Sequence, residues 1–328
     1  MAASTSPSGS TPAPMIPTKN DAKRLVLGNL CILIATIFFG VNIPAIKWLI
    51  PDDMSSFDVT AWRMLGGCVL FWAASMFVKT EPIQKGDWLT ILLGGGLGLF
   101  LFIFLFNLSL QFGNPIDISI IMTLPPIFVI LLEILFRHYK VSFLEVLGVL
   151  VSFGGAVIVI LNEHGGTGKA KHEIVGDLIA VASTLCYAFY LFILEKPTKT
   201  YHPISLLRWV FLGAAVPSLF LIPGVLHSKL LTTHAGWEPW AILAFIVTCP
   251  TFISYLLINP AVRFVGSEIT SLYQYLLPVF ATIAIVIIGM AKLDWIQVIA
   301  MAVIILGMIL TQISKRRKDK KAEAAQAV

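Results

Sequence analysis

Long apolar stretches alternate with short polar breaks along most of the chain. Each apolar stretch approaches the roughly 20 residues that a helix needs to cross a hydrocarbon core about 30 Å thick. The breaks hold charged residues, proline or glycine. The pattern predicts an all-α membrane protein with ten transmembrane helices, at residues 25–46, 59–78, 88–109, 115–136, 142–161, 174–195, 204–223, 239–258, 267–289 and 295–313.

Composition agrees with a chain that lies mostly in lipid. Hydrophobic residues make up 57% of the sequence and charged residues only 12%, whereas a soluble domain carries about 25% charged residues. The two ends differ from the rest. Residues 1–24 are mostly polar and small, which predicts a disordered cytoplasmic segment, and residues 314–328 form a basic cytoplasmic tail beside anionic headgroups.

The positions of lysine and arginine predict the orientation of the chain, because these residues concentrate in cytoplasmic loops. With ten helices and a cytoplasmic N-terminus, about 17 of them lie inside and about 6 outside. The six outside are Lys47, Arg63, Lys169, Lys171, Lys229 and Lys292. The count predicts a cytoplasmic (inner) membrane protein with both termini in the cytoplasm.

The two halves of the chain are related in sequence. A shift of 152 positions places residues 88–160 on 240–312 without a gap. Identical residues then coincide, such as Asn107 with Asn259 and Pro126 with Pro278. Five helices in each half reverse the orientation of the second half, which is the architecture of many secondary transporters. We therefore predict two inverted five-helix repeats, at 25–161 and 174–313, joined by an external linker at 162–173.

Several short motifs recur in a fixed order and resemble those of a known family. They are Phe39-Gly40-Val41-Asn42-Ile43-Pro44, Thr60-Ala61-Trp62-Arg63, Asn107-Leu108-Ser109-Leu110, Leu124-Pro125-Pro126-Ile127-Phe128 and Gly154-Gly155, with second-half counterparts such as Leu206-Leu207-Arg208-Trp209 and Leu276-Leu277-Pro278-Val279-Phe280. Together they resemble the drug/metabolite transporter superfamily in its ten-helix form of two EamA domains. The resemblance implies a central cavity, cytoplasmic termini and the export or exchange of metabolites such as amino acids. The sequence departs from the family pattern at Asn114-Pro115-Ile116-Asp117, where small residues are common.

Polar side chains inside the apolar stretches are candidates for solute binding, because polar groups in hydrocarbon are costly and face the interior of a bundle. The alternative for each is ordinary hydrogen bonding between helices. The candidate substrate-binding residues are Asn42, Arg63, Asn107, Tyr187, Tyr190, Tyr255, Asn259, Tyr273 and Gln274.

The charged candidates leave two interpretations open. Arg63 and Arg208 occupy corresponding positions near the start of a helix, so each either recognises an anionic group or extends toward the headgroups. Asp117 and Glu268 stand where a helix begins, so each either stabilises that N-terminus or carries a proton.

Prolines within the apolar stretches predict kinks. Pro44, Pro126 and Pro278 each remove a backbone donor and interrupt the helical hydrogen-bond ladder. Interrupted helices at corresponding positions of two repeats point to a transport site, although a static kink that improves packing is the alternative.

The sequence carries no motif for catalysis, for a metal, for a cofactor or for nucleic acid. The histidines lack metal-binding spacing, and Gly165-Gly166-Thr167-Gly168-Lys169 lacks the first glycine and the Ser/Thr of a phosphate-binding loop. We predict a secondary transporter, not an enzyme, that moves a small metabolite by alternating access, with the lipid bilayer as its surroundings and protons as candidate coupling ions. The alternatives are an intramembrane lipid-modifying enzyme and a membrane sensor or scaffold.

Overall fold

A computed structural model of the chain describes residues 19–50, 52–137, 141–161, 169–232 and 236–326, without the side chains of 19–22, 159–161, 169–171, 259, 262–263, 266–272, 274, 312 and 315–326. Within these ranges the regular structure is helical. The first half contains α1 (Lys19–Leu49), α2 (Ser56–Ser75), α3 (Trp88–Leu93), η1 (Gly94–Phe100), α4 (Leu101–Phe112), α5 (Pro115–Ile121), α6 (Pro125–Arg137) and α7 (Phe143–Leu161). The second half contains α8 (Lys169–Thr200), α9 (Pro203–Ser218), η2 (Leu219–Leu221), α10 (Ile222–Leu226), α11 (Lys229–Thr232), α12 (Trp237–Ile246), η3 (Val247–Ile253), α13 (Ser254–Tyr273), η4 (Gln274–Leu276), α14 (Leu277–Ile288) and α15 (Trp295–Gln326).

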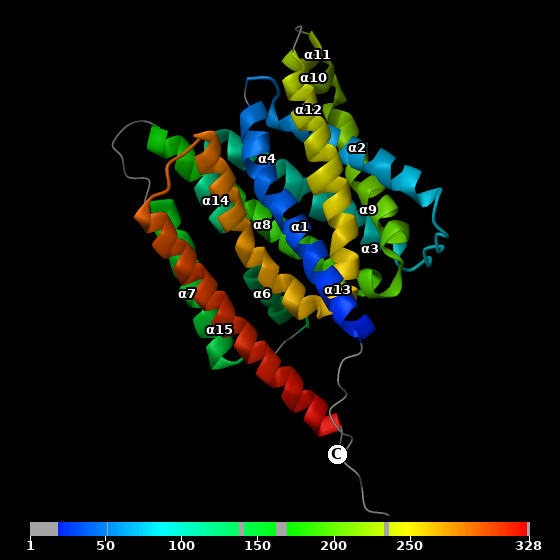
Figure 1. Ribbon diagram of the computed structural model, residues 1–328, viewed down its shortest axis with the longest axis vertical. Coiled ribbons are helices and arrows are strands. Elements are labelled where there is room, and N and C mark those ends of the chain that lie inside the picture. Colours follow the sequence, from blue (N-terminus) through cyan, green and yellow to red (C-terminus); the bar gives the residue numbers. More distant parts are fainter. Residues whose placement is uncertain (1–18, 51, 138–140, 162–168, 233–235, 327–328) are drawn as a thin grey trace, which may run out of the picture.

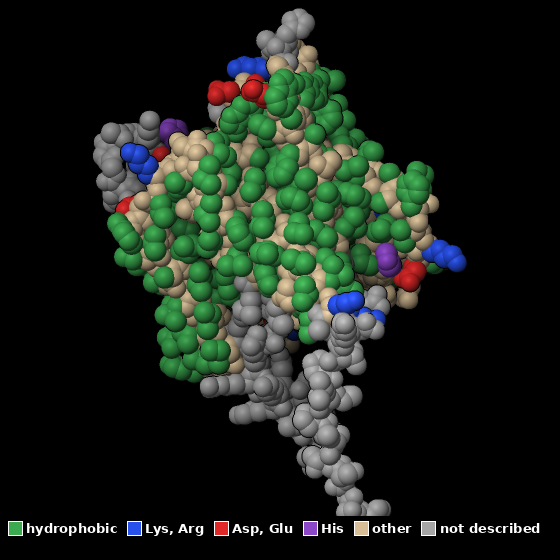
Figure 2. Space-filling model, in the orientation of Figure 1, with side chains coloured by type: hydrophobic (Ala, Val, Ile, Leu, Met, Phe, Trp, Pro, Cys, Tyr) green, Lys and Arg blue, Asp and Glu red, His purple; other side chains and the backbone are tan. Residues whose placement is uncertain are grey.

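The helices form a bundle whose long members run roughly along one direction (Figure 1). Among the described residues, six helical segments are long and apolar enough to cross a membrane: Lys23–Leu49, Trp88–Phe112, Pro115–Arg137, His172–Thr200, Pro203–Leu226 and Trp237–Ile258. Three shorter apolar helices accompany them, at Phe143–Ile158, Leu277–Ile288 and Trp295–Thr311. Figure 2 shows hydrophobic side chains over the middle of one face and charged side chains near its margins. The chain is therefore an all-helical, multi-pass membrane protein.

Local sequence signals fix several helix ends. The side chain of Ser55 accepts from the backbone N–H of Asp58, and the carboxylate of Asp58 accepts from the N–H of Ser55 at 2.9 Å, so the pair caps α2. Asn114 caps α5 in the same way through the N–H of Ile116. Helix α14 ends at Gly289, whose φ of 77° is accessible to glycine at little cost.

The helices are interrupted at matching places in the two halves. The π-helical turns η1 and η3 coincide to within one residue under the shift of 152 positions. The break between α5 and α6, at 122–124, coincides with the 3₁₀ turn η4 at Gln274–Leu276 under the same shift. The sequence repeat is therefore also a repeat of irregular backbone.

Helices α7 and α15 pair along one flank of the bundle (Figure 1), and their contacts obey the same shift. A Cβ atom added at Gly155 would lie 2.6 Å from Cγ1 of Ile304, and one added at Gly307 would lie 2.3 Å from Oγ of Ser152. The shift converts the first pair into the second. Partner numbers fall along α15 as they rise along α7, so these corresponding helices run antiparallel.

The two halves also exchange packing partners. The first helix of the first half, α1, packs against α13 and α14 of the second half. The first helix of the second half, α8, packs against α4 and α6 of the first. Each half therefore completes the core of the other, and the space between them lies at the centre of the bundle.

Three boundaries differ from the sequence-based expectations. Helix α1 begins at Lys19, so the last residues of the segment predicted to be disordered are helical, because no proline or glycine stops the helix there; residues 1–18 lie outside the described part. Helix α8 begins at Lys169, so residues 169–173 of the predicted linker are helical. Helix α13 continues to Tyr273, through the boundary expected between the eighth and ninth helices.

Candidate functional site

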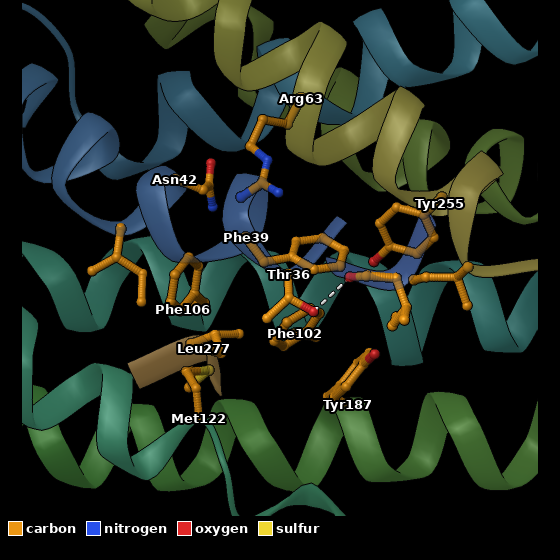
Figure 3. A pocket seen from close by; sticks show the side chains of 13 residues that line it. Thr36, Phe39, Asn42, Arg63, Phe102, Phe106, Met122, Tyr187, Tyr255 and Leu277 are labelled. Atoms are coloured by element: carbon orange, nitrogen blue, oxygen red, sulfur yellow. Dashed lines mark hydrogen bonds between the residues drawn. The ribbon is translucent and has the colours of Figure 1, made fainter. Parts of the chain in front are cut away.

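A cavity of about 140 Å³ lies where the two halves meet. Its wall combines helices of both: α1, α2, α4 and the α5–α6 break from the first, with α8, α13 and α14 from the second (Figure 3). The lining residues are Ile32, Thr36, Phe39, Asn42, Ile43, Arg63, Phe102, Phe106, Met122, Tyr187, Tyr255, Ile258 and Leu277.

Arg63 is the charged residue of this wall. Its side chain is 3% exposed, and Figure 3 shows the guanidinium group directed into the cavity beside Asn42. The Nε–H donates to Oγ1 of Thr251 at 3.1 Å, while Nη1 is buried and has no hydrogen-bond partner among the described residues. A buried cation with an unused donor favours an anionic group as its partner. The Arg63 side chain is buried within the bundle and does not reach its surface.

The position of Arg63 depends on a proline in the opposite repeat. Pro250 lies within η3 and has no N–H, so the carbonyl of Ile246 loses its α-helical donor. The hydroxyl of Thr251 donates to this carbonyl at 2.8 Å and accepts from Arg63. The interrupted helix thus supplies the acceptor that holds the arginine in place.

Asn42 gives the site a neutral polar group. It lies in α1 two residues before Pro44, through which the helix continues, and it is 3% exposed. Its Oδ1 atom has no hydrogen-bond partner among the described residues. An amide oxygen next to the Arg63 guanidinium can accept from an N–H or O–H of a bound solute.

Aromatic side chains form the remaining wall. Tyr187 stacks on Phe102 with 4.5 Å between ring centroids, and Tyr255 meets Phe39 edge to face at 6.0 Å. Both tyrosines carry a hydroxyl group into a mostly apolar surface (Figure 3). A few polar groups in an apolar wall are typical of small-molecule sites.

Four of the nine predicted binding residues line the cavity: Asn42, Arg63, Tyr187 and Tyr255. Three others lie outside it. Asn107 donates to Thr60 at 2.9 Å, Tyr190 is buried behind Tyr187, and Tyr273 donates to Asn29 at 2.8 Å. The side chains of Asn259 and Gln274 are outside the described part of the chain.

The predicted kink residues have different surroundings. Pro44 is buried within the unbroken α1. Pro126 and Pro278 are each the second residue of their helix, α6 and α14, directly after the two matching breaks. Met122, in the first break, and Leu277, just after the second, line the cavity. The irregular backbone of each repeat therefore reaches the same central space.

Sequence reasoning missed the apolar part of the wall and the role of Thr251. Ile32, Thr36, Phe39 and Ile43 line the cavity from α1, and their spacing of three and four residues places them on one helical face. That spacing is a usable signal, although an apolar stripe is also what ordinary helix packing requires. Nothing in the sequence around Thr251 indicates its contact with Arg63.

The remaining charged candidates lie away from the cavity. Arg208 stands over the rings of Trp72 and Trp209, at 5.4 and 5.3 Å, which is a cation–π arrangement. Asp117 is buried and accepts from Nε2 of Gln297 at 2.7 Å, while Asn114 caps its helix. The side chain of Glu268 is not among those described.

The fold and the repeat agree with a known family. A family model described as the EamA-like transporter family matches residues 26–161 and again 174–313. The chain belongs to the EamA-like transporter family. With its membrane-spanning helices, this membership makes the protein a membrane transporter, and the family is part of the drug/metabolite transporter superfamily.

Individual relatives of the chain are also described as transporters. The chain is 25% identical over 279 residues to "Uncharacterized transporter YyaM" of Bacillus subtilis (strain 168), covering 84% of this chain and 90% of the relative. It is 28% identical over 258 residues to "Uncharacterized transporter YxxF" of the same organism, covering 79% of each chain. A solved structure described only as "Crystal structure of protein" matches 90% of this chain and 98% of its own, with a TM-score of 0.59 and 20% identity, which supports the fold alone.

Proposed function

We propose that this EamA-family protein is a secondary transporter that moves a small organic solute with a carboxylate group, such as an amino acid, by alternating access. One observation supports this proposal above all. The buried guanidinium of Arg63 and the amide oxygen of Asn42 lie side by side in a cavity between the repeats, and Nη1 of Arg63 and Oδ1 of Asn42 have no hydrogen-bond partner among the described residues. The carboxylate would accept from Arg63, an N–H or O–H of the solute would donate to Asn42, and an apolar part would contact Phe39 and Phe102.

The pairing of the halves supports a mechanism for exposure of this site. Corresponding helices run antiparallel, and α1 and α8 each pack against the opposite half. Two similar halves that are inverted can exchange conformations, which turns a cavity open to one side into one open to the other. We infer ten membrane-spanning helices in two inverted repeats, both termini in the cytoplasm, a cytoplasmic-membrane location, and export or exchange as the physiological direction.

Uptake by proteoliposomes tests the proposal. The panel consists of matched pairs that differ only in the carboxylate, such as an amino acid and its amide, or an organic acid and the corresponding alcohol. We expect at least one carboxylate-bearing member to enter the vesicles and its partner to enter at least about tenfold more slowly. Equal rates for both members of every transported pair would refute carboxylate recognition. Flux no greater than in protein-free vesicles for the whole panel would favour the enzyme or scaffold alternatives.

A further inference from the structure

The two repeats differ at a pair of positions that the repeat makes equivalent. Gly28 in α1 and Gly176 in α8 stand at matching places in the first helix of each repeat, under a slightly smaller shift than the later helices obey. Each is a point of close contact with the other half. A Cβ atom at Gly28 would lie 2.9 Å from Phe264, and one at Gly176 would lie 2.4 Å from the backbone nitrogen of Gly113. The residue after each glycine therefore lies at a tight junction between the repeats. It is Asn29 in the first repeat and Asp177 in the second.

The side chain of Asn29 forms two hydrogen bonds, whereas that of Asp177 forms none among the described residues. The amide of Asn29 donates to the carbonyl of Leu25 and accepts from the hydroxyl of Tyr273, both at 2.8 Å. The side chain of Asp177 is fully buried, and neither carboxylate oxygen has a hydrogen-bond partner among the described residues. Because the side chain is buried within a helix that is long and apolar enough to cross a membrane, water does not replace the missing partners in this conformation.

Asp117 and Glu173 are acidic groups close to Asp177 in the fold. Glu173 lies one turn earlier on α8, and Asp117 lies on α5, which packs against α8. The ammonium of Lys47 on α1 donates to the carbonyls of Leu110 and Gly113, at 2.6 and 3.1 Å. An ionised Asp177 would be a buried anion without a hydrogen-bond partner in a low-dielectric interior, which is unfavourable, whereas a protonated carboxyl group carries no net charge.

Other polar groups near this junction, among the side chains that the structure describes, have contacts of their own. His172 on α8 is exposed and stacks on Phe112. Gln297 of α15 donates to Asp117 and accepts from the backbone N–H of Asp294 at 3.0 Å, and the side chain of Asp294 is exposed. None of these groups is a hydrogen-bond partner of Asp177 in the described part of the chain.

We propose that Asp177 is a proton-binding site that couples transport to a pH gradient. The carboxyl group holds its proton while α8 is closed on Gly113. When the junction opens, water reaches the group, the O–H bond breaks and the proton passes to water. Asp177 and the cavity residue Tyr187 lie on the same helix, about 15 Å apart, so one movement of α8 changes both sites. This proposal rests on the proposed transport function.

Infrared spectroscopy tests the proton site without a solute. Full-length protein in lipid at neutral pH is expected to show the carbonyl stretch of a protonated carboxyl group, and Asp177→Asn is expected to lose that band. Asp52→Asn is the matched control, because Asp52 is exposed in the loop after α1, and it is expected to keep the band. A wild-type spectrum with no protonated-carboxyl band at neutral pH overturns the proposal without recourse to any variant. So does a band that persists in Asp177→Asn.

Flux measurements then test coupling, with a solute selected by the proteoliposome panel. An imposed pH gradient is expected to accelerate transport by the wild-type protein and by Asp52→Asn. The transport rate of Asp177→Asn is expected to be the same with and without the gradient. Wild-type flux that is indifferent to the gradient, or gradient-driven flux retained by Asp177→Asn, overturns coupling. If no solute is transported, the proposed function fails, while the infrared result still decides whether Asp177 binds a proton.

Discussion

Arg63 and Arg208 show how equivalent residues acquire different surroundings. Both follow the start of the second helix of a repeat, yet Arg63 is buried in the central cavity and Arg208 lies between tryptophans at the edge of the bundle. The two repeats differ in the residue that could accept from the arginine. Arg63 donates to Thr251 in η3, whereas Leu99 of η1, which corresponds to Thr251 under the shift of 152 positions, has no side-chain acceptor. Identity in the repeat therefore does not imply identity of role.

Replacement of Arg63 by glutamine removes the charge that we assign to solute binding. A hydrogen bond to a charged group contributes about 1.5–3 kcal/mol, so uptake at low solute concentration is expected to fall by about 10- to 100-fold. Arg208→Gln is the control from the equivalent position and is expected to retain wild-type affinity. Initial rates in proteoliposomes measure both. Undiminished uptake by Arg63→Gln would remove the residue from the site.

Thr251→Val keeps the shape of the side chain and removes the acceptor for Arg63. The arginine then loses one of its restraints, so we expect KM to rise several-fold, in line with about 1 kcal/mol for one hydrogen bond, while the protein still folds. Thr248→Val is the matched control, since Thr248 is exposed and its hydroxyl donates to Ala244 within its own helix. A KM that is equal in the two variants would show that Thr251 does not position Arg63.

Polarity alone could predict part of the site. Asn42, Arg63, Tyr187 and Tyr255 stand out in the sequence because polar groups are rare within apolar stretches. Polarity does not distinguish Asp177, although it lies in such a stretch, because a carboxylate near the start of a helix resembles an ordinary N-terminal residue. Its isolation depends on the close approach of two glycines, which only the tertiary structure shows.

At the scale of elements, the prolines predicted breaks but not their form. The matching interruptions after Met122 and at Gln274–Leu276 were expected from Pro126 and Pro278. The π-helical turns η1 and η3 contain Gly98 and Pro250, which coincide under the shift of 152 positions and both weaken a helix. A weakened helix does not reveal how its hydrogen bonds rearrange. Helix existence was predictable from apolar length, whereas the continuation of α13 through the expected boundary was not.

The α7–α15 contact depends on glycines that have no room for a side chain. A methyl group at Gly307 would lie 2.3 Å from Oγ of Ser152 and 2.5 Å from the carbonyl oxygen of Gly148. Gly307→Ala is therefore expected to separate the helices and destabilise the protein by about 1–3 kcal/mol, which lowers the midpoint of thermal unfolding in detergent. Gly154→Ala is the control, because nothing lies within 4 Å of the added methyl group. Equal midpoints for both variants would contradict this packing.

At the scale of the whole molecule, both ends of the described chain lie together. The start of α1 and the end of α15 lie at the same end of the bundle (Figure 1). Ends that lie at the same end of the bundle agree with the even number of crossings that we propose, and the distribution of lysine and arginine favours the cytoplasm for that side.

Cysteine labelling tests this topology. In a variant without the four native cysteines, a cysteine at Lys85 or at Ala325 is expected to react with an impermeant maleimide only from the cytoplasmic side. A cysteine at Asp52 is expected to react only from the outside, because it follows the first crossing of the membrane. Reaction of the Lys85 and Ala325 positions from opposite sides would exclude an even number of crossings and the inverted repeat with it.

Counterflow in proteoliposomes tests the central claim most directly, that one site between the repeats faces the two sides of the membrane in turn. Vesicles are loaded with the unlabelled solute identified by the panel and diluted into a trace of the labelled solute. Alternating access predicts that the label rises transiently above its equilibrium level and that Arg63→Gln abolishes this rise. A label that only approaches equilibrium from below, as through a channel, would contradict the account.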